Sequence, residues 1–223
     1  MKYLYIIALS MFTSTVSFAQ WDGQSIDKDA KKILDKLKAQ YDTYQSMEVD
    51  FTLVFTLPEE DDEVQKGKVG QKGEKYFLQT EDREIYSDGT AIWLYLKSNN
   101  EVQLNDADMD EDEGDMLSPK DMMRIYESDD FVYAITDTKK ENGVSYTHIE
   151  FKPSDRDSEY SKMRLIVDTK ANKMKSLKVF SKDGSRYTLT IDKLKPNVSF
   201  ADADFVFDPN DYPGIHVEDL RID

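Results

Sequence analysis

The densest group of side chains that could bind a metal ion is the acidic run Asp106–Asp115 (DADMDEDEGD). Its first, third and fifth residues are acidic, as in a calcium-binding EF-hand loop. Such a loop also needs Gly at its sixth position and a bidentate Glu at its twelfth. Here those positions hold Glu111 and Leu117, so we interpret the run as a solvated acidic loop and expect no metal site.

The residues that usually carry catalysis are scarce. The chain has no Cys and only two His, His148 and His216, far apart in the sequence. It contains no G-x-S-x-G, no H-E-x-x-H and no glycine-rich phosphate loop. Acidic residues are so numerous that no glycosidase-type carboxylate pair stands out. The sequence therefore favours a binding function over an enzyme, without a cofactor.

Charge and composition exclude several classes of protein. The 223 residues carry 29 Lys and Arg against 45 Asp and Glu, a formal net charge of −16. This balance argues against nucleic acid and against loose adsorption to an anionic membrane, since both attract basic surfaces. Thirteen Tyr and eleven Phe are too many for a disordered acidic chain. We expect one folded unit with a core of its own.

The N-terminus has the pattern of a secretion signal. Lys2 precedes an apolar stretch, Tyr3–Phe12, which is too short to span a membrane as a helix. Ser17 and Ala19 fit the −3 and −1 positions of a cleavage site before Gln20. We expect residues 1–19 to be a signal peptide and residues 20–223 a single periplasmic domain. An uncleaved anchor is the alternative.

The elements that must position any site are one helix and many strands. Apolar residues in Asp27–Tyr44 recur at helical spacing. From Met47 to Leu57 apolar and polar residues alternate, as in a half-buried strand that Pro58 ends. Strand-like runs and tight-turn pairs such as Asp88-Gly89 and Asn142-Gly143 then alternate along the chain. About eleven strands result, which indicates a mainly β fold. The further runs lie near residues 64–71, 75–80, 83–87, 90–97, 101–105, 131–138, 144–152, 162–168, 173–181 and 186–193.

A second helix is expected where Ser118-Pro119 supplies an N-cap and a first helical proline. The residues after it, including Met122, Met123 and Ile125, are unusually apolar. Such a helix could plug one end of the sheet, or cover a ligand as a lid. Adjacent Met residues suit adaptable contacts with flexible apolar chains.

Several motifs in order resemble the outer-membrane lipoprotein carrier protein family (LolA), across essentially the whole chain after residue 19. One departure is the stretch Gln71–Glu74, where the family usually has a Lys-Arg-Pro element implicated in holding its lid closed. Lys72 is therefore assigned no latch role. The motifs that carry the resemblance are SMEVDFT at residues 46–52, SDGTAIWLY at 87–95, LSP at 117–119, ADFVFDP at 203–209 and GIHV at 214–217.

The resemblance implies an incomplete antiparallel β-barrel of about eleven strands covered by helices, in a protein that carries lipoproteins from the inner to the outer membrane. The protein would be a monomer. Its partners would be the acyl chains of lipoproteins, an inner-membrane lipoprotein-releasing transporter and an outer-membrane acceptor. An envelope sensor of the same fold, or an envelope glycan-binding protein or enzyme, are the alternatives. The acyl-chain wall would comprise Phe51, Phe55, Trp93, Tyr95, Met122, Met123 and Ile125, for each of which plain core packing is the alternative.

Overall fold

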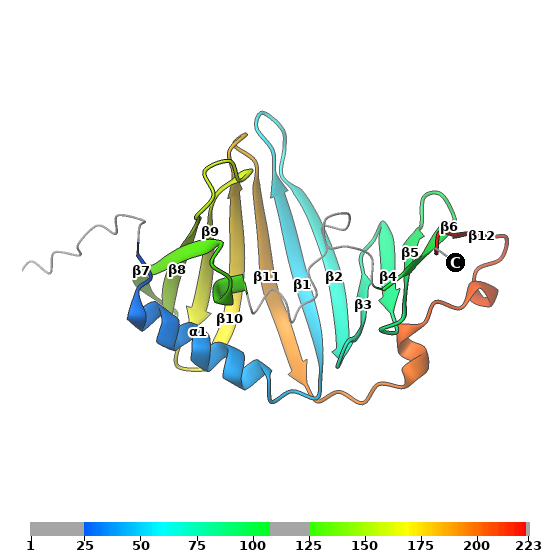
Figure 1. The fold of residues 1–223 in the computed structure, drawn as a ribbon, viewed down its shortest axis with the longest axis horizontal. Coiled ribbons are helices and arrows are strands. Elements are labelled where there is room, and N and C mark those ends of the chain that lie inside the picture. The colour runs from blue at the N-terminus through cyan, green and yellow to red at the C-terminus, as the bar shows by residue number, and fades with distance from the viewer. Residues whose placement is uncertain (1–24, 108–124, 222–223) are drawn as a thin grey trace, which may run out of the picture.

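The structure, a computed structural model, describes residues 25–107 and 125–221. All described strands belong to one twelve-stranded sheet with the order β12-β6-β5-β4-β3-β2-β1-β11-β10-β9-β8-β7 (Figure 1). Neighbouring strands are antiparallel, except that β12 runs parallel to β6. The strands are β1 Ser46–Thr56, β2 Glu63–Lys72, β3 Lys75–Gln79, β4 Arg83–Ser87, β5 Ala91–Leu96, β6 Glu101–Asp106, β7 Phe131–Glu141, β8 Val144–Pro153, β9 Tyr160–Asp168, β10 Lys173–Ser181, β11 Arg186–Pro196 and β12 His216–Asp219.

The mainly β prediction is confirmed, and so are all eleven predicted strands. The predicted turns also hold, because their second residues adopt the positive φ that Asn and Gly tolerate best. Gly89 has φ 86° and Gly143 has φ 84°. The sheet stays open, as expected for an incomplete barrel. Among the described strands only β12 was not predicted, and it adds one parallel pair to an otherwise antiparallel sheet.

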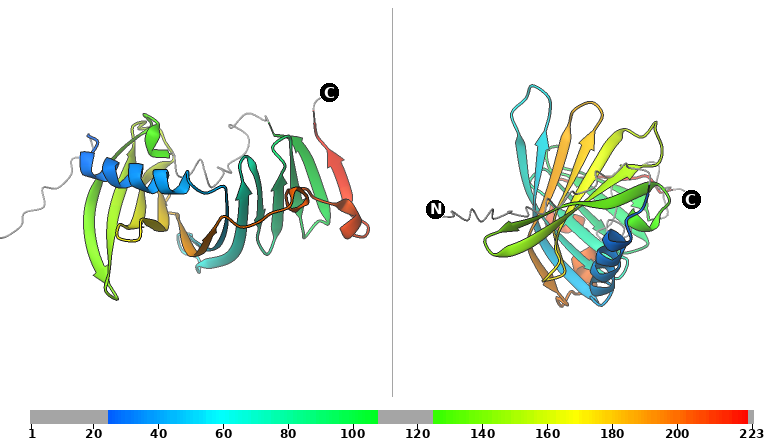
Figure 2. Two further views of the ribbon diagram at one scale, coloured as in Figure 1. Left: turned by 90° about the horizontal axis from the view of Figure 1, so that it is seen from below. Right: turned by 90° about the vertical axis from the view of Figure 1, so that its left-hand side faces the viewer.

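The sheet is strongly curved, and the two views in Figure 2 show α1 (Lys28–Tyr41) seated inside the curve. We call the face that packs against α1 the inner face and the opposite one the outer face. In β1 the alternation divides the residues cleanly. Leu53 and Phe55 lie on the inner face, whereas Thr52 and Val54 lie on the outer face.

Asp27 fixes the start of α1 to the sheet. Its side chain caps the helix by accepting hydrogen bonds from the backbone N–H groups of Asp29 (2.8 Å) and Ala30 (3.4 Å). The same carboxylate accepts from Ile135 N of β7 at 3.2 Å. At the other end Asn172, in the turn between β9 and β10, donates to Lys36 O at 2.8 Å. Both ends of α1 are therefore tied to strands.

The C-terminal segment covers the outer face of β3 to β6. It carries the short 3₁₀ helices η2 (Asp202–Phe205) and η3 (Pro209–Asp211). The ring of Phe205, which is fully buried, lies 6.1 Å from that of Phe77, and Phe207 stacks on Tyr212 at 4.6 Å. Lys72, the last residue of β2, donates to Phe200 O at 3.1 Å. The end of the chain thus forms an aromatic layer behind the sheet.

The outer face of β1, β2 and β8 to β11 is mainly polar, and most of its charged side chains are basic. Its carboxylates are Glu48, Asp50, Glu150, Asp168 and Asp192. Burial would raise the pKa of Glu150, but hydrogen bonds from Arg164 and Lys162, both 3.0 Å, outweigh it and leave the pKa below its ordinary value. The eleven basic residues on this face are Lys66, Lys68, Lys72, Lys152, Lys162, Arg164, Lys173, Lys178, Arg186, Lys193 and Lys195.

Candidate functional site

Two rows of apolar side chains cross the inner face from strand to strand. Directly paired residues of antiparallel strands share a face, so the register defines each row. The first row runs Leu53, Leu189, Leu177, Leu165 and Ile149 across β1, β11, β10, β9 and β8. The second row runs in parallel across the same strands and comprises Phe55, Tyr187, Val179, Met163 and Phe151.

Burial falls steadily along both rows. At the β8 end Ile149 and Phe151 are 0% and 2% exposed, because Leu34 and Leu37 of α1 pack into the same cluster. At the β1 end the side chains are only half-buried. We call these six half-buried residues the apolar band. They are Leu53, Phe55, Leu177, Val179, Tyr187 and Leu189.

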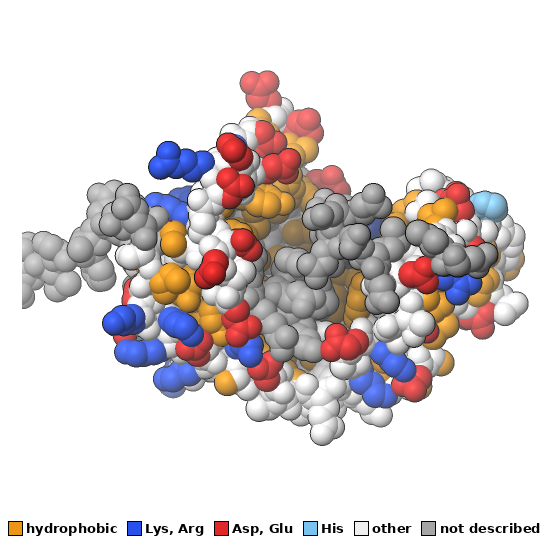
Figure 3. All heavy atoms as spheres, viewed as in Figure 1, with side chains coloured by type: hydrophobic (Ala, Val, Ile, Leu, Met, Phe, Trp, Pro, Cys, Tyr) orange, Lys and Arg blue, Asp and Glu red, His pale blue; other side chains and the backbone are white. Residues whose placement is uncertain are grey.

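The apolar band has a polar border on β2. Gln65 pairs with Leu53, and Glu63 pairs with Phe55, so each row ends in a polar residue. Within the band the only polar group is the Tyr187 hydroxyl, and its ring meets that of Phe55 edge-on at 5.7 Å. Figure 3 shows hydrophobic side chains in the hollowed face beside α1. A surface with so few hydrogen-bonding groups suits a flexible apolar ligand that needs no fixed orientation.

Phe51 supports the band from below rather than lining it. It is 6% exposed, and its ring lies over Gly67 of β2, where a Cβ would overlap the ring. Gly67 therefore makes room for Phe51 on the inner face. Gly70, three residues on, does the same for Phe77 on the outer face. On each face of β2, a glycine thus allows an aromatic ring to pack directly against the backbone.

The structure separates the residues that were predicted to form one wall. Phe55 lies in the apolar band and Phe51 beneath it. Trp93 and Tyr95 lie on the outer face, because the register from Val69 through Leu78 and Ile85 places Leu94, not its neighbours, on the inner face. They pack instead with Phe207 in the aromatic layer of the C-terminal segment. Met122 and Met123 lie outside the described residues, and Ile125 begins the short 3₁₀ helix η1 (Ile125–Glu127), with only its backbone described.

Sequence reasoning missed four members of the band: Leu177, Val179, Tyr187 and Leu189. Their strands were predicted, and apolar residues alternate with polar ones in both. That alternation was the available signal. What it lacked was the pairing of β11 with β1, which joins strands about 140 residues apart in sequence and brings these side chains beside Phe55.

The helix end of the site holds a half-buried tyrosine. Tyr41 of α1 packs against both the cluster beneath α1 and the cluster around Phe51. Burial raises the pKa of Tyr41 to about 12, although a hydrogen bond with the backbone of Met174 opposes the shift. The Tyr41 side chain thus fills the junction between helix and sheet.

Residues 25–107 and 125–221 show neither a metal site nor a membrane-spanning helix. This part of the chain holds no group of three or more His, Asp or Glu placed to bind a metal ion. It also holds no helix with the length and apolar character needed to cross a bilayer. His148 is buried in β8, and burial together with nearby Lys139 lowers its pKa.

Fold and site together define a half-open antiparallel β protein with an apolar inner face beside a single long helix. A family model described as "-like: Uncharacterized protein" matches residues 69–199, more than half of the chain, and the chain belongs to that family. The comparison with curated proteins gives no match.

Solved structures are similar to this chain at low sequence identity. An uncharacterized conserved protein from Thermus thermophilus aligns with a TM-score of 0.56 and 9% identity, over 87% of this chain and 100% of that one. The LolA superfamily protein NE2245 from Nitrosomonas europaea aligns with a TM-score of 0.42 and 15% identity, over 80% of this chain and 97% of that one. A putative outer membrane lipoprotein-sorting protein domain from Vibrio parahaemolyticus aligns with a TM-score of 0.44 and 13% identity, over 78% of this chain and 94% of that one.

Proposed function

We propose that this protein binds the acyl chains of lipoproteins on its inner face and carries them across the periplasm from the inner to the outer membrane. The observation that carries the proposal is the apolar band, a half-buried continuation of the core with a polar border on β2. The motifs that resemble the lipoprotein carrier family support the same function.

The acyl chains of a lipoprotein need an apolar surface to cross an aqueous compartment. Each buried methylene of an acyl chain is worth roughly 0.8 kcal/mol, so a multiply acylated protein strongly resists transfer into water. The band offers leucine, valine and aromatic side chains without a charged group among them. It can therefore shelter chains of variable length, and because directional bonds are few, it can release them again.

The remaining parts of the proposal follow from the resemblance. The protein would act in the periplasm as a monomer, would need no cofactor and would catalyse no reaction. It would receive cargo from an inner-membrane lipoprotein-releasing transporter and deliver it to an outer-membrane acceptor.

The test uses two substitutions in neighbouring positions of β1. Phe55→Asp places a carboxylate in the apolar band, whereas Val54→Asp places the same group on the outer face of the same strand. A fluorescent fatty-acyl probe should bind the wild type, and unlabelled diacylated lipoprotein should displace it. Because a charge must be desolvated to lie against an acyl chain, Phe55→Asp should weaken probe binding at least about tenfold. Val54→Asp should leave it near the wild-type value.

Equal loss in both variants would mean that the effect comes from damage to the strand and not from the band. Failure of the wild type to bind the probe, or of lipoprotein to displace it, would overturn the proposal.

A further inference from the structure

The outer face carries a charge opposite to that of the whole chain. Eleven basic side chains lie on the outer face of β1, β2 and β8 to β11, against five carboxylates, although the chain as a whole has a net charge of −16. The excess of positive charge is spread over six adjacent strands, a width of about 25 Å at the usual strand spacing. One side of the molecule is therefore basic although the net charge of the chain is negative.

Some of these cations are held in place by neighbouring groups. Lys162 and Arg164 both bond to Glu150 at 3.0 Å, and both lie within 5.6 Å of the centre of the Phe180 ring. Lys178 approaches the same ring at 5.4 Å. Three cations thus surround one aromatic ring and one carboxylate, which leaves the cluster positive.

Other cations on this face have no acidic partner within the described residues, which suggests an anionic partner outside the chain. Lys66, Arg186 and Lys193 are exposed, and among the described residues no carboxylate forms an ion pair with them. They flank β1 from β2 and β11. Long basic side chains grouped without acidic partners repel one another, so they favour an external anionic surface.

We propose that the outer face docks on the anionic headgroups of a lipid bilayer. Nine of its eleven cations are Lys, a residue depleted from protein–protein interfaces and typical of surfaces that bind acidic lipids. The face is broad and mainly polar, and its apolar side chains, such as Val54, Val64 and Phe180, are interspersed with basic ones. Such a surface lacks the packed apolar centre that usually anchors a protein partner. Acidic loops such as 58–63 lie at the strand ends, so the basic face alone fits a negative membrane. This inference concerns a different face from the proposed cargo site and does not depend on it.

The test is co-sedimentation of the purified protein with vesicles of pure phosphatidylcholine or of phosphatidylcholine and phosphatidylglycerol in equimolar mixture. Binding should occur with the anionic vesicles at low ionic strength and decline as salt screens the charges. Each basic residue near an acidic membrane contributes roughly fivefold to binding. Lys66→Gln, Lys193→Gln and Arg186→Gln combined should therefore weaken it by up to about a hundredfold.

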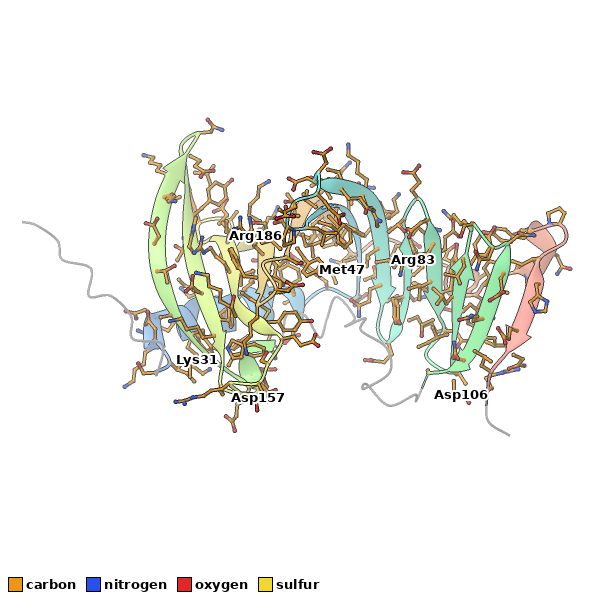
Figure 4. The ribbon with its side chains drawn as sticks, turned by 90° about the horizontal axis from the view of Figure 1, so that it is seen from above. Lys31, Met47, Arg83, Asp106, Asp157 and Arg186 are labelled. Atoms are coloured by element: carbon orange, nitrogen blue, oxygen red, sulfur yellow. The ribbon has the colours of Figure 1, made fainter. Side chains whose placement is uncertain are left out.

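The matched control combines Lys28→Gln, Lys36→Gln and Lys140→Gln, exposed lysines on α1 and near the end of β7. It changes net charge by the same amount and should bind nearly as the wild type does. Figure 4 shows Lys31 of α1 well apart from Arg186 of β11, so the two regions can be tested separately. Equal weakening in both triple variants, or no binding of the wild type to anionic vesicles, would refute the docking face. So would equal binding to both kinds of vesicle, which would indicate apolar insertion.

Discussion

Removing the Asp27 carboxylate should loosen α1 from the sheet. In Asp27→Ala the helix loses its N-cap, which usually costs about 1 kcal/mol. The backbone N–H of Ile135, which is partly buried, also loses its partner, and an unsatisfied donor shielded from water costs about 1–3 kcal/mol. We therefore expect the free energy of unfolding to fall by about 2–4 kcal/mol, measured by urea denaturation with the slope unchanged.

Asp29→Ala is the matched control, because Asp29 also lies in the first turn of α1 but its carboxylate pairs with Lys32, and 74% of its side chain is exposed. The free energy of unfolding of Asp29→Ala should fall by only a small fraction of the decrease expected for Asp27→Ala. Hydrogen exchange adds a local readout. Protection should fall first in α1 and β7, where Asp27 joins the two, while β1 and β2 keep theirs. If the two variants lost equal stability, or if exchange rose evenly through the sheet, the role assigned to Asp27 would be refuted.

Two further predictions concern the junctions around the apolar band. Gly67→Ala should destabilise the protein by about 1–3 kcal/mol, because its Cβ would overlap the Phe51 ring and lie 2.8 Å from Gln79 O. In a double-mutant cycle with Phe51→Leu the combined loss should be smaller than the sum, whereas strict additivity would contradict the contact. Tyr41→Phe should alter the response to alkali, because the Tyr41 pKa of about 12 exceeds its unfolded value of 10.0. The wild type should therefore lose stability relative to Tyr41→Phe as pH rises from 10 to 12, and parallel unfolding curves at each pH would argue against the burial of the phenol.

Local patterns were enough to predict the strands but not to predict which side chains share a face. Alternation in 47–57 correctly separates inner from outer residues within β1, since the side-chain period of a strand is two. Relating Phe51 to Trp93 requires the register of four successive pairs between β1 and β5. A shift of one residue in any of these pairs would move Trp93 to the other face. Local alternation carries no information about that register, and the prediction of a common wall failed there.

The strand β12 eluded prediction for a different reason. His216–Asp219 is exposed along its whole length, so it shows no alternation between buried and exposed positions. It joins the sheet through its backbone alone, beside β6. Burial of Phe205 and Phe207 determines the path of the C-terminal segment and so places β12 beside β6. Those contacts arise only in the folded chain.

The strands that carry the apolar band also carry the basic surface, because successive residues point to opposite faces. Lys178 lies between Leu177 and Val179, and Lys66 and Lys68 flank Gly67 beneath Phe51. A molecule that docked on a bilayer through its outer face would therefore present the band away from that bilayer. Docking could concentrate the carrier at a membrane, but it could not insert the cargo there directly. Transfer of the cargo would then need a second protein that contacts the open inner face. The proposed transporter and acceptor would supply that contact.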